Sequence, residues 1–185
     1  VLSRLGSQAI HAGKRARTET DISRYTTSVS HAAALIVRQR AAAVSPDMPR
    51  KVLIVGAGEM AHLAAKALDG ETVAFVNRSD ERAQTLAGQT GAFAFAWEER
   101  DQALVWADAV ITATSAPHAL LGVAMLAQVV GQRRGRELLC VDIAVPRNID
   151  PAVDRLSGVS RCDIDNLRAI VDTNTGRRAA AIPTV

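Results

Sequence analysis

Residues 51–61 read Lys-Val-Leu-Ile-Val-Gly-Ala-Gly-Glu-Met-Ala, and this stretch decides the fold. Its short apolar run predicts a buried strand over residues 51–55. The glycines that follow form the pattern G-x-G-x-x-A, a permitted form of the dinucleotide-binding fingerprint. In that pattern Gly56 permits a tight turn, Gly58 lets the backbone approach a pyrophosphate, and Ala61 lets a helix pack close to the strand. The free N–H groups of the first helical turn would then face the phosphates.

Strands and helices alternate along the chain after this stretch. We expect strands over 51–55, 72–76, 92–95, 109–113, 138–143 and 159–162, and helices over 59–68, 80–87, 97–106 and 120–130. Alternating strands and helices with continuous apolar strands indicate a parallel sheet covered on both faces. The predicted fold class is therefore α/β, a doubly wound parallel sheet of the Rossmann, dinucleotide-binding type with a helical N-terminal extension.

The chain is predicted to have three parts. Residues 1–45 form a helical connecting segment, residues 46–165 the dinucleotide-binding domain, and residues 166–185 a C-terminal helix. In the first part, Thr26 and Thr27 are expected to cap a helix over 28–43, because threonine side chains accept hydrogen bonds from free backbone N–H groups.

The end of the second strand, Asn77-Arg78-Ser79, points to the choice of cofactor. A site for NAD usually has an acidic residue about 20 residues after the glycines, which holds the ribose hydroxyl. Counting from Gly56 reaches Val76 and Asn77, so the acid is missing. Arg78 and Ser79 instead offer the cation and the hydroxyl that a 2′-phosphate needs, which favours NADPH. The alternative is an ordinary helix start, with Ser79 as its cap and Arg78 in solvent.

Two further loops follow strands of the predicted sheet, 113–117 and 142–147, and both combine small residues with a proline. Ligands of open α/β sheets bind at the carboxyl ends of the strands, where these loops lie; simple turn chemistry is the alternative. The candidate cofactor-binding residues are Gly56, Ala57, Gly58, Glu59, Met60, Ala61, Asn77, Arg78, Ser79, Thr114, Ser115, Ala116, Ile143, Ala144 and Pro146. The sequence lacks G-x-S-x-G, H-E-x-x-H, P-loop and CxxC motifs, so we assign no catalytic or metal-binding residue.

Composition sets broader limits. The formal net charge of +3 over 185 residues is too weak a bias to imply a nucleic-acid partner. Two basic clusters, Lys14 to Arg17 and Arg133 to Arg136, are interpreted as solvated surface. The longest apolar stretch, 119–130, is shorter than the roughly 20 residues of a membrane span. Cys140 and Cys162 show no disulfide or metal spacing, which fits a reducing cytoplasm.

Several of these segments together resemble the middle of the glutamyl-tRNA reductase family. The resemblance runs in order over nearly the whole chain, and the matching segments are residues 13–20, 28–33, 56–60, 77–79, 113–117, 142–150 and 162–167. The Gly-Lys-Arg-x-Arg-Thr-Glu-Thr and Asp-Ile-Ala-Val-Pro-Arg segments are much more specific than a glycine fingerprint.

This resemblance implies an activity for the longer protein. In the family, a cysteine of an N-terminal domain attacks glutamyl-tRNA, and NADPH on the middle domain reduces the thioester to glutamate-1-semialdehyde for tetrapyrrole (porphyrin and heme) synthesis. A C-terminal helical domain makes the homodimer. The nucleophile would then precede residue 1 and the dimerisation domain would follow residue 185, so this piece alone is expected to be inactive. The implied partners are glutamyl-tRNA and the next enzyme of the pathway, and no membrane is implied.

Two alternatives stay open. The chain could be the cofactor domain of another NADP-dependent reductase, such as a shikimate-type enzyme, which shares an Asn-Arg-Ser/Thr signature. Those enzymes carry a lysine and an aspartate in a substrate domain, and no such pair is found here. The other alternative is a non-catalytic module that binds NADP and regulates a partner.

Overall fold

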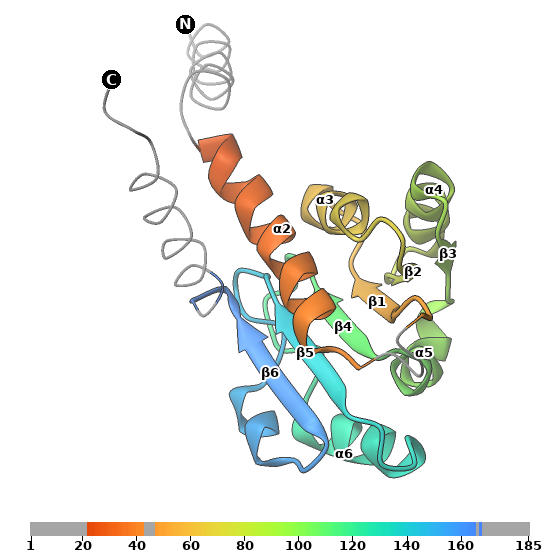
Figure 1. Ribbon diagram of the computed structural model, residues 1–185, viewed down its shortest axis with the longest axis vertical. Helices are drawn as coiled ribbons and strands as arrows, with labels where there is room; N and C mark the ends of the chain where they lie inside the picture. Colours follow the sequence, from red (N-terminus) through yellow and green to blue (C-terminus); the bar gives the residue numbers. More distant parts are fainter. Residues whose placement is uncertain (1–21, 43–46, 166, 168–185) are drawn as a thin grey trace, which may run out of the picture.

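A computed structural model describes residues 22–42, 47–165 and 167 (Figure 1). Within these residues one sheet has the strand order β3-β2-β1-β4-β5-β6, and every neighbouring pair is parallel. The strands are β1 Lys51–Val55, β2 Thr72–Val76, β3 Phe93–Ala94, β4 Ala109–Thr112, β5 Leu138–Asp142 and β6 Val159–Asp163. This order is that of the doubly wound dinucleotide-binding sheet, so the predicted fold class is confirmed.

Helices cover both faces of the sheet. The α-helices are α2 Ile22–Arg40, α3 Glu59–Ala67, α4 Asp80–Thr90, α5 Arg100–Trp106 and α6 Val123–Gln132, and the short 3₁₀ helices are η1 Trp97–Glu99 and η2 Pro151–Arg155. Successive strand residues point to opposite faces. Val52 and Ile54 therefore pack with α2, α3 and α4, whereas Leu53 and Val55 pack with α5 and α6 (Figure 1). Among the described residues, no helix is long and apolar enough to cross a membrane.

Helix α2 differs from its prediction at both ends. It begins at Ile22 instead of residue 28 and ends at Arg40 instead of residue 43. Thr26 and Thr27 thus lie inside the helix, and their prediction as caps is wrong, because the helix continues through both residues. The second half of α2 packs into the same core cluster as one face of the sheet, through Val29, Ala32, Ala33, Ile36 and Val37. The small alanine side chains allow the helix to lie close to α3.

Part of the predicted organisation lies outside the described residues. This applies to the basic cluster from Lys14 to Arg17 and, apart from Leu167, to the C-terminal helix expected over 166–185. The division of the chain at residues 45 and 165 stays a prediction.

The second basic cluster is not simply solvated surface. Arg134 is exposed, but Arg133 is 1% exposed, and Arg136 forms an ion pair with the buried Asp108 at 3.1 Å. The guanidinium of Arg133 donates hydrogen bonds to backbone carbonyl oxygens of Leu104, Val105, Ala107, Arg136 and Glu137. The interpretation as solvated surface is therefore wrong for Arg133, which ties the end of α5 to the connection between α6 and β5.

Helix α6 begins later than predicted, at Val123 instead of residue 120. The backbone N–H groups of Leu120 and Leu121 both donate to the carbonyl oxygen of Asn148, and Leu121 forms a parallel bridge with Ile149. These contacts keep the two residues out of the helix and fasten the loop after β4 to the loop after β5.

Candidate functional site

The turn after β1 requires glycine at its first position. Gly56 has a φ of +122°, and a Cβ atom there would lie 2.5 Å from the carbonyl oxygen of Ala113. Gly58 has an ordinary φ of −96° and is the N-cap of α3, and a Cβ atom there would meet nothing within 4 Å. The space before the free N–H groups of α3 is therefore open, which is the arrangement that an anion needs at a helix start.

The remaining residues of this turn divide between surface and core. Ala61 is fully buried, whereas Glu59 at the first position of α3 is exposed. Met60 packs against the core, and the hydroxyl of Ser30 donates to its carbonyl oxygen at 3.3 Å. Helix α2 thus supports the first turn of α3 from behind, and Met60 faces the protein.

At the end of β2 the structure forms a capped helix start. The backbone N–H of Arg82 donates to Oγ of Ser79 at 3.4 Å, and Nδ2 of Asn77 donates to the carbonyl oxygen of Ser79 at 3.1 Å. Ser79 is therefore the cap of α4, as the alternative interpretation expected. Arg78 is exposed, and its guanidinium carbon lies 6.0 Å from the centre of the Trp97 ring.

A pocket of about 360 Å³ lies between the glycine turn and α4. Its lining residues are Ala57, Ser79, Glu81, Arg82, Thr85, Leu86 and Gln89. The pocket brings the predicted Ala57 and Ser79 together with Arg82, which sequence reasoning missed. The available signal was its position three residues after the helix cap, on the first turn of α4.

The loops after β4 and β5 meet as predicted, and Asn148 joins them. The hydroxyl of Thr114 donates to Oδ1 of Asn148 at 2.6 Å and accepts from the N–H of Ala116 at 3.0 Å. The side-chain amide of Asn148 donates in turn to the carbonyl oxygens of Ala116 and Pro146, at 3.2 and 3.4 Å. Ser115 and Pro146 are exposed at this edge.

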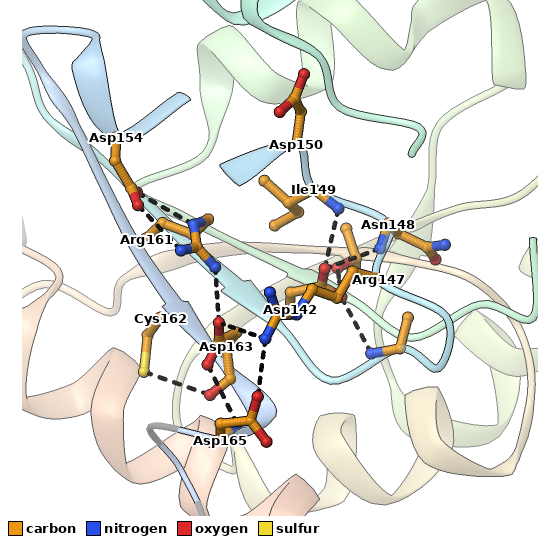
Figure 2. A network of polar contacts seen from close by, with 12 residues as sticks. Asp142, Arg147, Asn148, Ile149, Asp150, Asp154, Arg161, Cys162, Asp163 and Asp165 are labelled. Carbon is orange, nitrogen blue, oxygen red and sulfur yellow. Dashed lines mark hydrogen bonds and ion pairs between the residues drawn. The ribbon is translucent and has the colours of Figure 1, made fainter. Parts of the chain in front are cut away.

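The buried carboxylate of Asp142 shapes the loop after β5 (Figure 2). Oδ1 accepts from the hydroxyl of Thr112 at 2.7 Å and from the N–H of Ala144 at 3.1 Å. Oδ2 accepts from the N–H groups of Asn148 and Ile149, at 2.8 and 2.9 Å. This carboxylate is satisfied from inside the protein, so it serves to fold the loop.

Ile143 and Ala144 lie in that loop with side chains turned inward. Their exposed fractions are 3% and 4%. Any contact with a ligand at this edge of the sheet would therefore come from their backbone atoms, which the sequence could not indicate.

A network of ion pairs fixes the end of β6 beside this loop (Figure 2). The guanidinium of Arg161 contacts Asp154 through two hydrogen bonds, of 2.9 and 3.1 Å, and contacts Asp163 at 2.9 Å. The hydrogen bonds with Asp154 raise the pKa of Arg161. Arg147, from the loop after β5, contacts Asp165 at 2.8 Å and Asp163 at 3.4 Å. The network links the loop after β5 to the end of the sheet.

Neither cysteine has the environment of a nucleophile. Cys140 and Cys162 are free and buried. Burial raises the pKa of the Cys140 thiol to about 12, and burial also raises the pKa of Cys162. A nucleophilic cysteine needs a lowered pKa and access to its substrate. The residues thus form a site that can bind and orient a ligand, with neither thiol suited to attack it.

The chain is similar to known proteins in sequence and in structure. The family described as Shikimate / quinate 5-dehydrogenase matches residues 39–170. Glutamyl-tRNA reductase of Desulfitobacterium hafniense (strain DSM 10664 / DCB-2) is 42% identical over 184 residues, which cover 98% of this chain and 41% of the relative. The chain therefore spans less than half of that relative's length.

Two solved structures are similar to the chain. Glutamyl-tRNA reductase from Methanopyrus kandleri is 36% identical, with a TM-score of 0.76, and the match covers 96% of this chain and 45% of that one. The nucleotide binding domain of glutamyl-tRNA reductase from Thermoplasma volcanium is 21% identical, with a TM-score of 0.62 over 82% of this chain and 96% of that one. At that identity the second likeness concerns the fold alone.

Proposed function

Because the chain belongs to the glutamyl-tRNA reductase family and, over residues 39–170, to the Shikimate / quinate 5-dehydrogenase family, we propose that it is the NADPH-binding domain of a glutamyl-tRNA reductase. The observation that carries this proposal is the turn after β1. Position 56 requires glycine because the backbone of Ala113 comes close to it, while the space in front of Gly58 and the start of α3 is open. A pyrophosphate fits such a turn, because free N–H groups and the helix dipole both favour a negative charge there.

The preference for NADPH is argued from the end of β2. The three residues directly after β2, Asn77, Arg78 and Ser79, include no acidic residue to hold a ribose hydroxyl. Arg82 lines the pocket beside Ser79 and adds a second guanidinium at this edge. Glu81 also lines the pocket, and its negative charge repels a phosphate. The 2′-phosphate would therefore lie against Ser79 and the two arginines.

The bound cofactor supplies a hydride to the acyl carbon of the substrate. The residues of this chain bind and orient it. The turn at Gly56 and Gly58 holds the pyrophosphate, and two loops border the rest of the cofactor at the carboxyl edge of the sheet: Thr114, Ser115, Ala116 and Ile143, Ala144, Pro146. The hydrogen bonds of Asn148 and Asp142 fix the shape of these two loops. A rigid frame of this kind would keep the nicotinamide ring of the cofactor in one orientation.

The reaction belongs to the longer protein. We propose that it reduces glutamyl-tRNA to glutamate-1-semialdehyde for tetrapyrrole synthesis in the cytoplasm, as a homodimer that passes its product to the next enzyme. The attacking cysteine would come from another domain, since Cys140 and Cys162 are buried. We therefore expect the 185-residue chain to bind the cofactor without turnover.

Calorimetric titration of the chain with NADPH and with NADH tests the proposal. Tighter binding of NADPH, lost in Arg78→Ala, is the expected result. Arg155→Ala is the matched control, because Arg155 is an exposed arginine of η2 that we place outside the site. Equal affinity for the two cofactors would exclude the NADPH assignment, and failure to bind either would contradict the dinucleotide site itself.

The match to the Shikimate / quinate 5-dehydrogenase family supports a second candidate, the cofactor domain of a shikimate-type enzyme. Both candidates bind a nicotinamide cofactor, so the longer protein must separate them. Oxidation of NADPH that depends on glutamyl-tRNA favours the first candidate, and reduction of NADP that depends on shikimate or quinate favours the second.

A further inference from the structure

Trp97 lies against Arg78, although the two residues belong to different elements. The guanidinium carbon of Arg78 is 6.0 Å from the centre of the indole ring, and that of Arg100 is 5.1 Å from the same ring. Cations within about 6 Å of a tryptophan face are attracted by the ring, and tryptophan is the strongest aromatic partner. Trp97 therefore restrains the cation that we assign to the 2′-phosphate.

The backbone of Trp97 is fastened to the start of α4. Oδ1 of Asp80, the first residue of α4, accepts a hydrogen bond from the backbone N–H of Trp97 at 3.1 Å. Asp80 follows Arg78 by two residues, so this bond fastens η1 next to the loop that carries Arg78. The indole is partly buried, which holds the ring in place from the protein side.

Of the two arginines next to the ring, Arg78 is the one that can bind a ligand. Arg100 donates to Oδ1 of Asp101 through two nitrogen atoms, at 3.0 and 3.1 Å, so its charge is balanced next to the ring. Arg78 is exposed, and an exposed arginine loses side-chain freedom when it binds. A ring contact that already restricts Arg78 reduces the entropy lost on binding a phosphate.

We infer that Trp97 is a positioning residue for cofactor selection: it holds Arg78 in place for the 2′-phosphate that distinguishes NADPH from NADH. The inference rests on the proposed function and deepens it, because it names a residue outside the nucleotide-binding motifs as a determinant of the preference. It predicts that Trp97 affects only ligands that carry a 2′-phosphate, and only while Arg78 is present.

The first test compares two probes that differ in the 2′-phosphate alone, 2′,5′-ADP and 5′-AMP, by calorimetry on the 185-residue chain. In Trp97→Leu the affinity for 2′,5′-ADP should fall by roughly three- to five-fold, while the affinity for 5′-AMP stays unchanged. Trp97→Phe should lose less, because a phenyl ring attracts a cation more weakly. In an Arg78→Ala background, Trp97→Leu should cause no further loss.

Trp106 provides the matched control. It also has a cation against its ring, Lys51 at 5.9 Å, but Lys51 is the first residue of β1 and lies away from the carboxyl ends of the strands. Trp106→Phe should leave both affinities unchanged. It also leaves Trp97 as the sole tryptophan, since the chain has two. In this variant 2′,5′-ADP should change the tryptophan fluorescence and 5′-AMP should not.

The outcomes separate this inference from the proposed function. If the unmodified chain binds both probes equally well, the NADPH assignment and the inference fail together. If it prefers 2′,5′-ADP and Arg78→Ala removes the preference, but Trp97→Leu keeps it, only the role of Trp97 is overturned. An equal loss for both probes in Trp97→Leu, or a fluorescence response to 5′-AMP as large as that to 2′,5′-ADP, would also overturn it.

Discussion

A Cβ atom at Gly56 would lie 2.5 Å from the carbonyl oxygen of Ala113. Gly56 follows β1 and Ala113 follows β4, and these neighbouring strands run parallel, so the two backbones meet at the carboxyl edge of the sheet. The same glycine has a φ of +122°, a conformation that side chains disfavour. This close approach gives Gly56 a structural requirement that Gly58 lacks.

Alanine substitutions at the two glycines should therefore have different effects. Gly56→Ala should destabilise the chain by about 2–4 kcal/mol, because backbone strain and a clash with backbone atoms combine. Gly58→Ala should cost less than about 1 kcal/mol but weaken NADPH binding by roughly ten-fold or more, because its Cβ would occupy the space proposed for the pyrophosphate. Urea unfolding and calorimetry measure the two effects. Comparable stability losses, or full binding by Gly58→Ala, would contradict this prediction.

The sequence predicted the sheet well because its signals are local. The apolar run of β1, the glycines after it and the alternation of elements need only neighbouring residues to be recognised. Thr26 and Thr27 were misplaced as caps, since threonine tolerates a helix interior as well as its start. The contacts of Trp97 and Arg133 arise from packing between distant segments, which no local pattern encodes.

Asp142→Asn should destabilise the chain by about 2–3 kcal/mol. The carboxylate accepts three backbone N–H groups and the Thr112 hydroxyl, whereas an amide has one oxygen and would turn its NH₂ group towards donors. The hydroxyl of Thr112 can reverse its direction, but a backbone N–H cannot. Urea unfolding measures the loss. Thr112→Val is the control and should cost only about 1 kcal/mol, since it removes a single donor; a larger loss for Thr112→Val than for Asp142→Asn would refute the argument.

Arg133→Met should destabilise the chain by at least about 3 kcal/mol. Burial lowers the pKa of Arg133 to about 10, because burial disfavours the charged guanidinium. Hydrogen bonds to backbone carbonyl oxygens offset this cost, and methionine would leave the buried carbonyl oxygens of Leu104 and Ala107 without this donor. Arg134→Met is the matched control, because Arg134 is exposed, and it should change the free energy of unfolding by less than about 0.5 kcal/mol. Equal effects of the two substitutions in urea unfolding would mean that the cost of desolvating Arg133 is as large as the stabilisation by its hydrogen bonds.

Cys140 should make the chain less stable at alkaline pH. Burial raises the pKa of its thiol from 9.0 to about 12, so the folded state keeps the proton after the unfolded state has lost it. The contribution of the thiol to stability is therefore complete below about pH 9 and is lost as the pH rises from there towards 12, by up to about 1.4 kcal/mol per pH unit.

Cys140→Ala should remove this part of the pH dependence, whatever its effect on stability at neutral pH. Urea unfolding of both chains at about pH 7 and about pH 10 measures the difference, which should be about 1.4 kcal/mol. Cys162 is present in both chains and cancels in the comparison. The same pH dependence with and without Cys140 would show that the thiol ionises as readily in the folded chain as in the unfolded one.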